Sequence, residues 1–178
     1  MSVTIWFEPH STSLDNEAGL ASGWNDVDLS EQGAKQSQEL AARCRSRGID
    51  AIFVSDLQRS YKTAVPLAKE LKVPIYVDSR LRECDYGEYT QKPKKELDSI
   101  KIMHMSESFP NGESYNDCML RVHDFLVELK KNFNGKTILI IGHRATQYGI
   151  ENMVLHKPLD QSLTEAWQWQ PGWKYECA

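Results

Sequence analysis

The sequence predicts an α/β protein, a three-layer α/β/α sandwich with a mostly parallel central sheet. Apolar, β-branched runs of strand length recur along the 178-residue chain, most clearly at 137–143, where the letters read TILIIGH. Segments with apolar residues at helical spacing separate these runs. Strands that alternate with helices favour a parallel sheet with helices on both faces.

The elements can be assigned in chain order from their periodicity and their boundary residues. The predicted strands cover 5–7, 51–55, 73–78, 137–143 and 164–170. The predicted helices cover 30–48, with Ser30 as the N-cap, then 57–71, a possible helix within 84–112, a stretch ending near 133, and one after 143. In the last strand, TEAWQWQ, the tryptophans Trp167 and Trp169 are expected to share one face and pack on the core. A stacking platform of Trp167, Trp169 and Trp173 for a base or sugar is the alternative interpretation.

Composition narrows the function classes. The net charge of −4 and the pI near 5.7 argue against a general nucleic-acid binder. Four widely spaced cysteines without a CxxC pair favour reduced thiols over a disulfide or metal framework. With no long apolar run, no linker and no internal repeat, we expect one domain over 1–178 in a soluble, cytoplasmic protein without a membrane partner.

Two histidines stand where predicted core strands end. His10 follows the first strand and His143 follows the strand at 137–142. Because ligands of parallel α/β sheets bind beyond the carboxyl ends of the strands, the fold could bring these imidazoles together.

An arginine and a carboxylate follow two further strands in the same way. Arg59 lies one turn into the helix after 51–55, and Glu83 lies just beyond 73–78. A guanidinium binds phosphate well, an imidazole can act as a nucleophile and a carboxyl group can protonate a leaving oxygen. The set suits a phosphate monoester, and a positive cleft would lower the pKa of the nucleophilic histidine and keep it neutral.

Five motifs in the same order as in a known family extend this interpretation. They are PHSTSLDN at 9–16, VSDLQRSYKTA at 54–64, LRECDYGEY at 81–89, PNGESY at 110–115 and IIGHRATQ at 140–147. On these motifs the chain resembles the histidine phosphatase superfamily, also called phosphoglycerate mutase-like, over nearly its whole length.

The resemblance implies a mechanism. His10 would be the nucleophile that becomes phosphohistidine, and Glu83 would be the proton donor. His143, Arg59 and Asn16 would hold the phosphoryl oxygens. The implied substrate is a small phosphorylated molecule, and the implied chemistry needs no metal or other cofactor.

The chain departs from the family pattern beside the nucleophile. The family's Arg-His-Gly is Pro9-His10-Ser11 here, so one guanidinium of the phosphate pocket is missing. Arg144, which follows His143, is the leading candidate to replace it. Arg82 is a second candidate, and the hydroxyl and N–H groups of residues 11–13, Ser11 among them, are a third.

This departure leaves a second class of function open. A metal-independent phosphatase is the favoured interpretation, and a weak or inactive phospholigand-binding or interaction protein on the same fold is the alternative. Phosphoglycerate mutase-type transfer ranks below hydrolysis, because the stretch between Glu83 and His143 is short for a lid. A zinc site at His10, His143 and Glu83 is disfavoured, because Arg59 would repel the cation.

Overall fold

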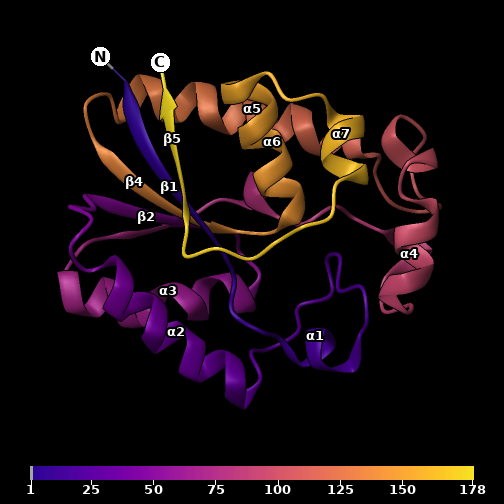
Figure 1. Cartoon of the computed structure of the whole chain (residues 1–178), viewed down its shortest axis with the longest axis horizontal. Coiled ribbons are helices and arrows are strands. Elements are labelled where there is room, and N and C mark those ends of the chain that lie inside the picture. Colours follow the sequence, from indigo (N-terminus) through magenta and orange to yellow (C-terminus); the bar gives the residue numbers. More distant parts are fainter. Residues whose placement is uncertain (1) are drawn as a thin grey trace.

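The computed structural model describes residues 2–178, in which five strands form one sheet in the order β3-β2-β4-β1-β5 (Figure 1). The strands are β1 (Val3–Pro9), β2 (Ala51–Val54), β3 (Ile75–Val77), β4 (Thr137–Gly142) and β5 (Trp173–Cys177). The α-helices are α1 (Leu14–Ala18), α2 (Glu31–Cys44), α3 (Gln58–Leu71), α4 (Lys94–Ile100), α5 (Tyr115–Asn132), α6 (Arg144–Leu155) and α7 (Leu159–Thr164). Short 3-10 turns occupy Ser79–Leu81, Gly87–Tyr89 and Met103–Met105.

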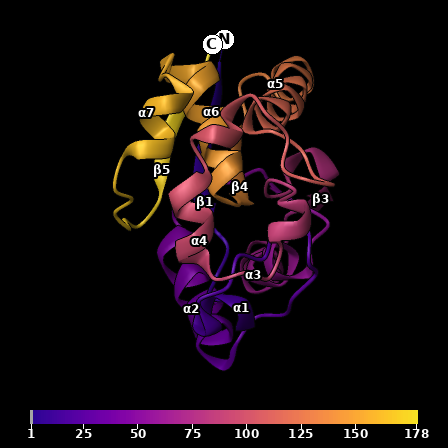
Figure 2. The same ribbon diagram turned by 90° about the vertical axis from the view of Figure 1, so that its right-hand side faces the viewer.

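The predicted three-layer sandwich is confirmed. Helices α2 and α3 cover one face of the sheet, and α5 and α6 cover the other (Figures 1 and 2). The first four strands pair in parallel, whereas β5 runs antiparallel to β1 at one edge. The two ends of the chain therefore lie side by side (Figure 1).

Strand β4 lies at the centre of the sheet and contributes side chains to both layers of the core. Its residues Ile138 and Ile140 pack with Phe7 and Phe125 beneath α5 and α6. Leu139 and Ile141 point the other way, into the cluster beneath α2 and α3. A continuous apolar run is what a strand buried on both faces requires, so the sequence signal at this strand was unambiguous.

The prediction of a strand over 164–170 is wrong. Residues 165–172 have no regular secondary structure, and the strand begins at Trp173, opposite Phe7. Pro171 and Gly172 separate the two segments, and Gly172 adopts a φ of +88° that favours glycine. Trp167 and Trp169 are consequently outside the sheet and stay 43% and 58% exposed, and neither belongs to the buried core, although Trp167 stacks on Trp173 with ring centroids 6.2 Å apart.

Two smaller differences concern helices. Helix α2 ends at Cys44, four residues before the predicted end, and α1 forms in a stretch for which no helix was predicted. Serines cap both helices, since Ser30 accepts from the N–H of Gly33 and Ser13 accepts from that of Asn16.

The structure also gives observations on membrane-spanning helices and on the cysteines. Within residues 2–178, no helix combines the length and apolar character that a membrane span requires. All four cysteines are buried and free.

Candidate active site

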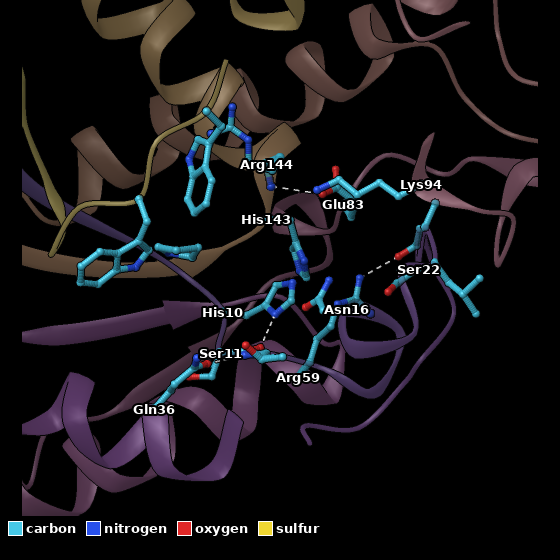
Figure 3. Close-up of a pocket in the computed structure, with 18 of the residues that line it drawn as sticks. His10, Ser11, Asn16, Ser22, Gln36, Arg59, Glu83, Lys94, His143 and Arg144 are labelled. Carbon is cyan, nitrogen blue, oxygen red and sulfur yellow. Dashed lines mark hydrogen bonds between the residues drawn. The ribbon is translucent and has the colours of Figure 1, made fainter. Parts of the chain in front are cut away.

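Strands β1 and β4 bring His10 and His143 together. The strands pair in register up to Pro9 opposite Gly142, and the N–H of His10 continues the ladder to the carbonyl of Gly142 at 2.9 Å. Each strand is followed at once by its histidine, so the two rings lie with their centroids 5.0 Å apart (Figure 3).

The histidines lie on a cavity of about 660 Å³ beyond the carboxyl ends of the strands. Seven of the residues singled out in the sequence line this cavity: His10, Ser11, Asn16, Arg59, Glu83, His143 and Arg144. They come from four segments that are far apart in the chain, and Figure 3 shows them facing a common space. The volume is that of a small-molecule site and is larger than a phosphate group needs.

The ring of His10 is oriented by its own backbone. Its Nδ1 lies 2.8 Å from the carbonyl oxygen of Ser11, which can only accept, so Nδ1 carries the proton and Nε2 keeps its lone pair. Burial, and then the positive charge of Arg59, lower the pKa of His10 to about 3. The imidazole is therefore neutral near pH 7, which a nucleophile requires.

His143 is fixed by a serine at the end of the neighbouring strand. Its Nε2 lies 2.7 Å from the hydroxyl of Ser55, just beyond β2. With Ser55 as donor, the ring proton lies on Nδ1, which is buried and has no partner among the described residues. Burial, Arg59 and His10 hold the pKa of His143 well below its usual value, so this ring is also neutral.

Arg59 is a buried cation at the floor of the cavity. It is 1% exposed and donates to the carbonyls of Gly23 and Asn25, both at 2.8 Å. Its Nε has no partner among the described residues, so this donor remains for an anion. The two carbonyl bonds fix the plane of the guanidinium in advance, so little order has to be gained when a ligand binds.

Glu83 lies against the N-terminus of α6. Its carboxylate accepts the N–H groups of Cys84 at 2.8 Å and of Arg144 and Ala145 at 3.1 Å. A helix N-terminus favours a negative charge, which accounts for a carboxylate that is only 8% exposed. The main-chain carbonyl of Glu83 is held as well, by Trp24 and by Arg121 at 2.8 Å each.

Asn16 presents its amide nitrogen to the cavity. Its Oδ1 accepts the N–H of Ser13 at 3.0 Å in the capping box of α1, so the carbonyl end is occupied and the NH₂ group is left for a ligand.

The predicted anion cradle of N–H groups after His10 does not form. The N–H of Ser11 donates to Thr63, that of Thr12 to Gln36 and that of Ser13 to Asn16. The N–H of Ser11 is therefore satisfied inside the protein, and only its hydroxyl can still serve an anion.

Pro9 occupies a position where its missing N–H removes no ladder bond. Successive N–H groups of a strand point to opposite sides, and that of His10 points to β4. Position 9 therefore faces the β5 side, where pairing has already ended at Phe7. A proline is tolerated at such a strand end.

The two arginines considered as replacements for the family's arginine are engaged elsewhere. The guanidinium of Arg144 donates to Gln147 at 2.7 Å and lies over the ring of Trp167 at 5.2 Å. Arg82 makes two hydrogen bonds to Asp56, at 2.7 and 2.6 Å, and does not line the cavity.

One cluster within residues 2–178 has the composition of a metal site. Ligand atoms of Cys84, Glu113 and Cys118 lie within 4.8 Å of one another. The guanidinium of Arg121 donates to Glu113 at 2.6 Å and contacts the sulfur of Cys118 at 3.2 Å. A fixed cation already neutralises this cluster, so the cluster is poorly suited to a metal ion.

Some residues of the site were not predicted from the sequence. Ser55 orients His143, while Trp24 and Arg121 hold the main chain of Glu83. Ser55 could have been noticed as the polar end of a core strand. Arg121 carried no local signal, since it lies on α5 and reaches Glu83 only in the folded protein.

Comparisons with known proteins show the family to which the chain belongs. The model of the histidine phosphatase superfamily (branch 1) matches residues 5–171. Phosphoserine phosphatase 1 of Hydrogenobacter thermophilus is 30% identical over 143 residues, which covers 75% of this chain and 67% of that protein. A 2,3-bisphosphoglycerate-dependent phosphoglycerate mutase of Methylobacterium sp. is 30% identical over 149 residues, which covers 75% of this chain and 72% of that protein.

Solved structures share the fold. YhfR of Bacillus stearothermophilus superimposes with a TM-score of 0.81 at 24% identity, covering 95% of this chain and 88% of that one. A mycobacterial glucosyl-3-phosphoglycerate phosphatase gives 0.78 at 22% identity, covering 92% and 84%. With a family model that spans most of its length, the chain belongs to the histidine phosphatase superfamily.

Proposed function

We propose that this protein is a phosphomonoester hydrolase that acts through a phosphohistidine intermediate on a small phosphorylated molecule, without a metal. The observation that carries the proposal is the pair of neutral imidazoles, His10 and His143, 5.0 Å apart on one cavity with Arg59 and Glu83. Membership of a superfamily that includes phosphatases supports it.

In the first step, Nε2 of His10 attacks phosphorus while the bond from phosphorus to the ester oxygen breaks. The carboxyl group of Glu83 gives its proton to the departing oxygen, so the alcohol leaves neutral. In the second step, water attacks phosphorus and the N–P bond breaks. The carboxylate of Glu83 takes the proton of that water, which restores both residues and releases phosphate.

Hydrogen-bond donors that the fold has already oriented stabilise the negative charge of the phosphoryl group. Arg59 offers its unpaired Nε, His143 its unpaired Nδ1–H and Asn16 its amide NH₂. Donors held in position before reaction stabilise a transition state without reorganisation, and removal of one costs on the order of a hundredfold in rate. Three such donors support catalysis in spite of Pro9.

We also propose that residues 1–178 act as one domain. Strands from the two ends of the chain, β1 and β5, pair with each other, and the site draws on segments from residue 10 to residue 169. Hydrolysis ranks above transfer to a second substrate, because the part of the chain between Glu83 and α5 holds only the seven-residue helix α4 and short turns.

The test is hydrolysis of p-nitrophenyl phosphate from pH 5 to 8, with and without a chelator, by the wild type and by His10→Ala. We expect turnover that survives the chelator and falls by at least about a thousandfold in His10→Ala. His156→Asn is the matched control, because His156 is exposed at the end of α6 and its φ of 55° suits asparagine. Rapid quenching followed by intact-mass measurement should reveal one acid-labile phosphoryl group on the wild type.

Wild-type turnover no faster than that of His10→Ala, on this ester and on a panel of alkyl phosphates, would contradict the proposal. Binding of inorganic phosphate without turnover would then favour the phospholigand-binding alternative.

A further inference from the structure

The cavity has an aromatic wall that the phosphate chemistry does not use. Trp167 and Trp169 line the same cavity as His10, and they lie in the irregular segment 165–172 that joins α7 to β5. Figure 1 shows this segment passing from α7 below α6 to the edge strand. Neither indole belongs to a buried cluster of the core, and both are exposed, Trp169 more than Trp167.

The segment is held against the strand that carries His10. Glu8, fully buried two residues before His10, accepts from Arg43 and from Arg47 at 2.9 Å each. Arg47 also donates to the carbonyl of Pro171 at 2.7 Å. A side chain at Gly172 would meet the Glu8 carboxylate at 2.8 Å, so the backbone of the segment packs directly on this buried group.

Each indole rests on a cation that is itself fixed. The guanidinium of Arg43 lies 5.7 Å from the ring centroid of Trp169, and Arg43 is tied to Glu8. The guanidinium of Arg144 lies 5.2 Å from the centroid of Trp167 and is bonded to Gln147. Cation–π contacts orient such rings without burying them. The result is a preorganised aromatic surface that remains exposed at the cavity.

We propose that this surface binds the leaving group of the substrate, and that the leaving group carries a flat aromatic ring. The proposal rests on the proposed function and names its substrate class: a phosphomonoester whose ring stacks on Trp169, with Trp167 as the adjoining wall. Trp169 is the principal contact because it is the more exposed of the two. Leu20 and Leu97 add further apolar surface to the same cavity.

Size and chemistry both favour a ring over a short polar leaving group. A cavity of about 660 Å³ has room for a ring-sized group in addition to phosphate. A short aliphatic group would leave the two indoles in water, whereas a ring removes apolar surface on both partners and gains stacking.

The experiment compares two esters that differ only in the ring, 2-phenylethyl phosphate and 2-cyclohexylethyl phosphate. Their leaving alcohols are equally basic and of equal reach, so kcat/KM reports recognition of the flat ring. We expect the wild type to prefer the phenyl ester by about tenfold, a typical gain from one stacking contact. Trp169→Ala should reduce that ratio to about one, and Trp169→Phe should keep most of it.

Tyr61→Ala is the matched control, because Tyr61 is a comparably exposed aromatic residue on α3 that does not line the cavity. It should leave the ratio unchanged. Equal rates for the two esters in the wild type would overturn the proposal. A ratio that survives both Trp169→Ala and the double variant Trp167→Ala/Trp169→Ala would overturn it as well.

A binding measurement separates this proposal from the proposed function. The non-hydrolysable 2-phenylethylphosphonate and 2-cyclohexylethylphosphonate are titrated calorimetrically into the wild type and Trp169→Ala. A phenyl preference that disappears in Trp169→Ala supports the aromatic subsite even where no ester is hydrolysed. Equal binding of the two phosphonates, or no binding, overturns the subsite whether or not the protein is a hydrolase.

Discussion

At the scale of single residues, the candidate site is built from side chains whose protons are assigned by their neighbours. The carbonyl of Ser11 fixes the proton of His10 on Nδ1, and with the hydroxyl of Ser55 as donor to Nε2, the proton of His143 lies on Nδ1 as well. One ring consequently presents a lone pair for attack, and the other presents a donor for a phosphoryl oxygen. Two chemically identical side chains thus acquire different tasks from one hydrogen bond each.

Ser55 is the residue on which this difference depends. We expect Ser55→Ala to leave Nε2 of His143 buried without a partner, at a cost of about 1–3 kcal/mol in the free energy of unfolding. The ring can then place its proton on either nitrogen, so kcat should fall by about tenfold or more while KM changes less. Steady-state kinetics and urea unfolding measure the two effects.

Ser162→Ala is the control for this prediction. Ser162 is also a buried serine, but its hydroxyl has no partner among the described residues. Its removal should leave stability and kcat nearly unchanged. A Ser55→Ala variant that behaves like Ser162→Ala would contradict the role assigned to Ser55.

At the scale of elements, the loop after His10 is held by the first turn of α2. The carbonyl of Thr12 accepts from the N–H and the hydroxyl of Ser30, at 3.0 and 3.3 Å. Gly33, in the same turn, lies so close that a Cβ there would overlap the carbonyl oxygen of Thr12. The helix can approach the loop only because this position lacks a side chain.

Gly33→Ala should therefore displace the loop and lower both stability and activity. We expect about 2 kcal/mol or more of destabilisation, as in other overpacked sites, and at least a tenfold loss in kcat/KM, because Ser11 and His10 move with Thr12. Thermal unfolding and hydrolysis of an aryl phosphate are the measurements.

Gly135→Ala separates backbone strain from the close approach. Gly135 has a φ of +76° and open space around it, far from the cavity. It should lose some stability through strain, on the order of 1 kcal/mol, without loss of activity. Equal activities for the two alanine variants would show that the contact between α2 and the loop does not position His10.

Helices and strands were predicted well where the spacing of their own apolar residues determines the structure. They were predicted poorly where contacts with distant parts of the chain determine it. Strand β4 and helix α5 followed from their own side chains. TEAWQWQ alternates like a strand, yet the segment containing Pro171 and Gly172 is anchored to Glu8 and Arg47, which starts β5 at Trp173. The sequence of 164–170 contains no pattern from which the contact of the following residues with Glu8 could be predicted.

At the scale of the whole molecule, the sequence contained enough to find most of the candidate site but not its environment. His10, Arg59, Glu83 and His143 were found because each follows a strand and falls in a motif of the family. Pro9 costs no hydrogen bond of the sheet because of the register in which β1 pairs with its neighbours, and this register is known only from the folded structure. The aromatic wall was only the alternative interpretation of the tryptophans for a similar reason, because the fold and not the local sequence directs those indoles to the cavity.

The neutral histidines also couple the stability of the whole protein to pH. In the unfolded chain a histidine titrates near pH 6.5, whereas in the folded protein the pKa of His10 is lowered to about 3 and that of His143 is lowered well below its usual value. As the pH falls below 6.5, His10 and His143 bind protons in the unfolded chain but not in the folded protein. Stability from this source is therefore complete above pH 6.5 and is lost progressively toward pH 3.

Between pH 7 and 5 we expect the free energy of unfolding to fall by about 1 kcal/mol or more from His10, with a further fall from His143. The hydrogen bond from Lys62 lowers the pKa of Asp28, and the backbone N–H of Thr137 lowers that of Asp50, so these two carboxyl groups titrate below this pH range. Urea unfolding at pH 7, 6 and 5 measures the slope. The double variant His10→Asn/His143→Asn should flatten it, whereas His156→Asn, which changes only an exposed histidine, should not. Parallel slopes for the wild type and the double variant would mean that both imidazoles titrate in the folded protein as they do in the unfolded chain, and a neutral nucleophile near pH 5 would then be untenable.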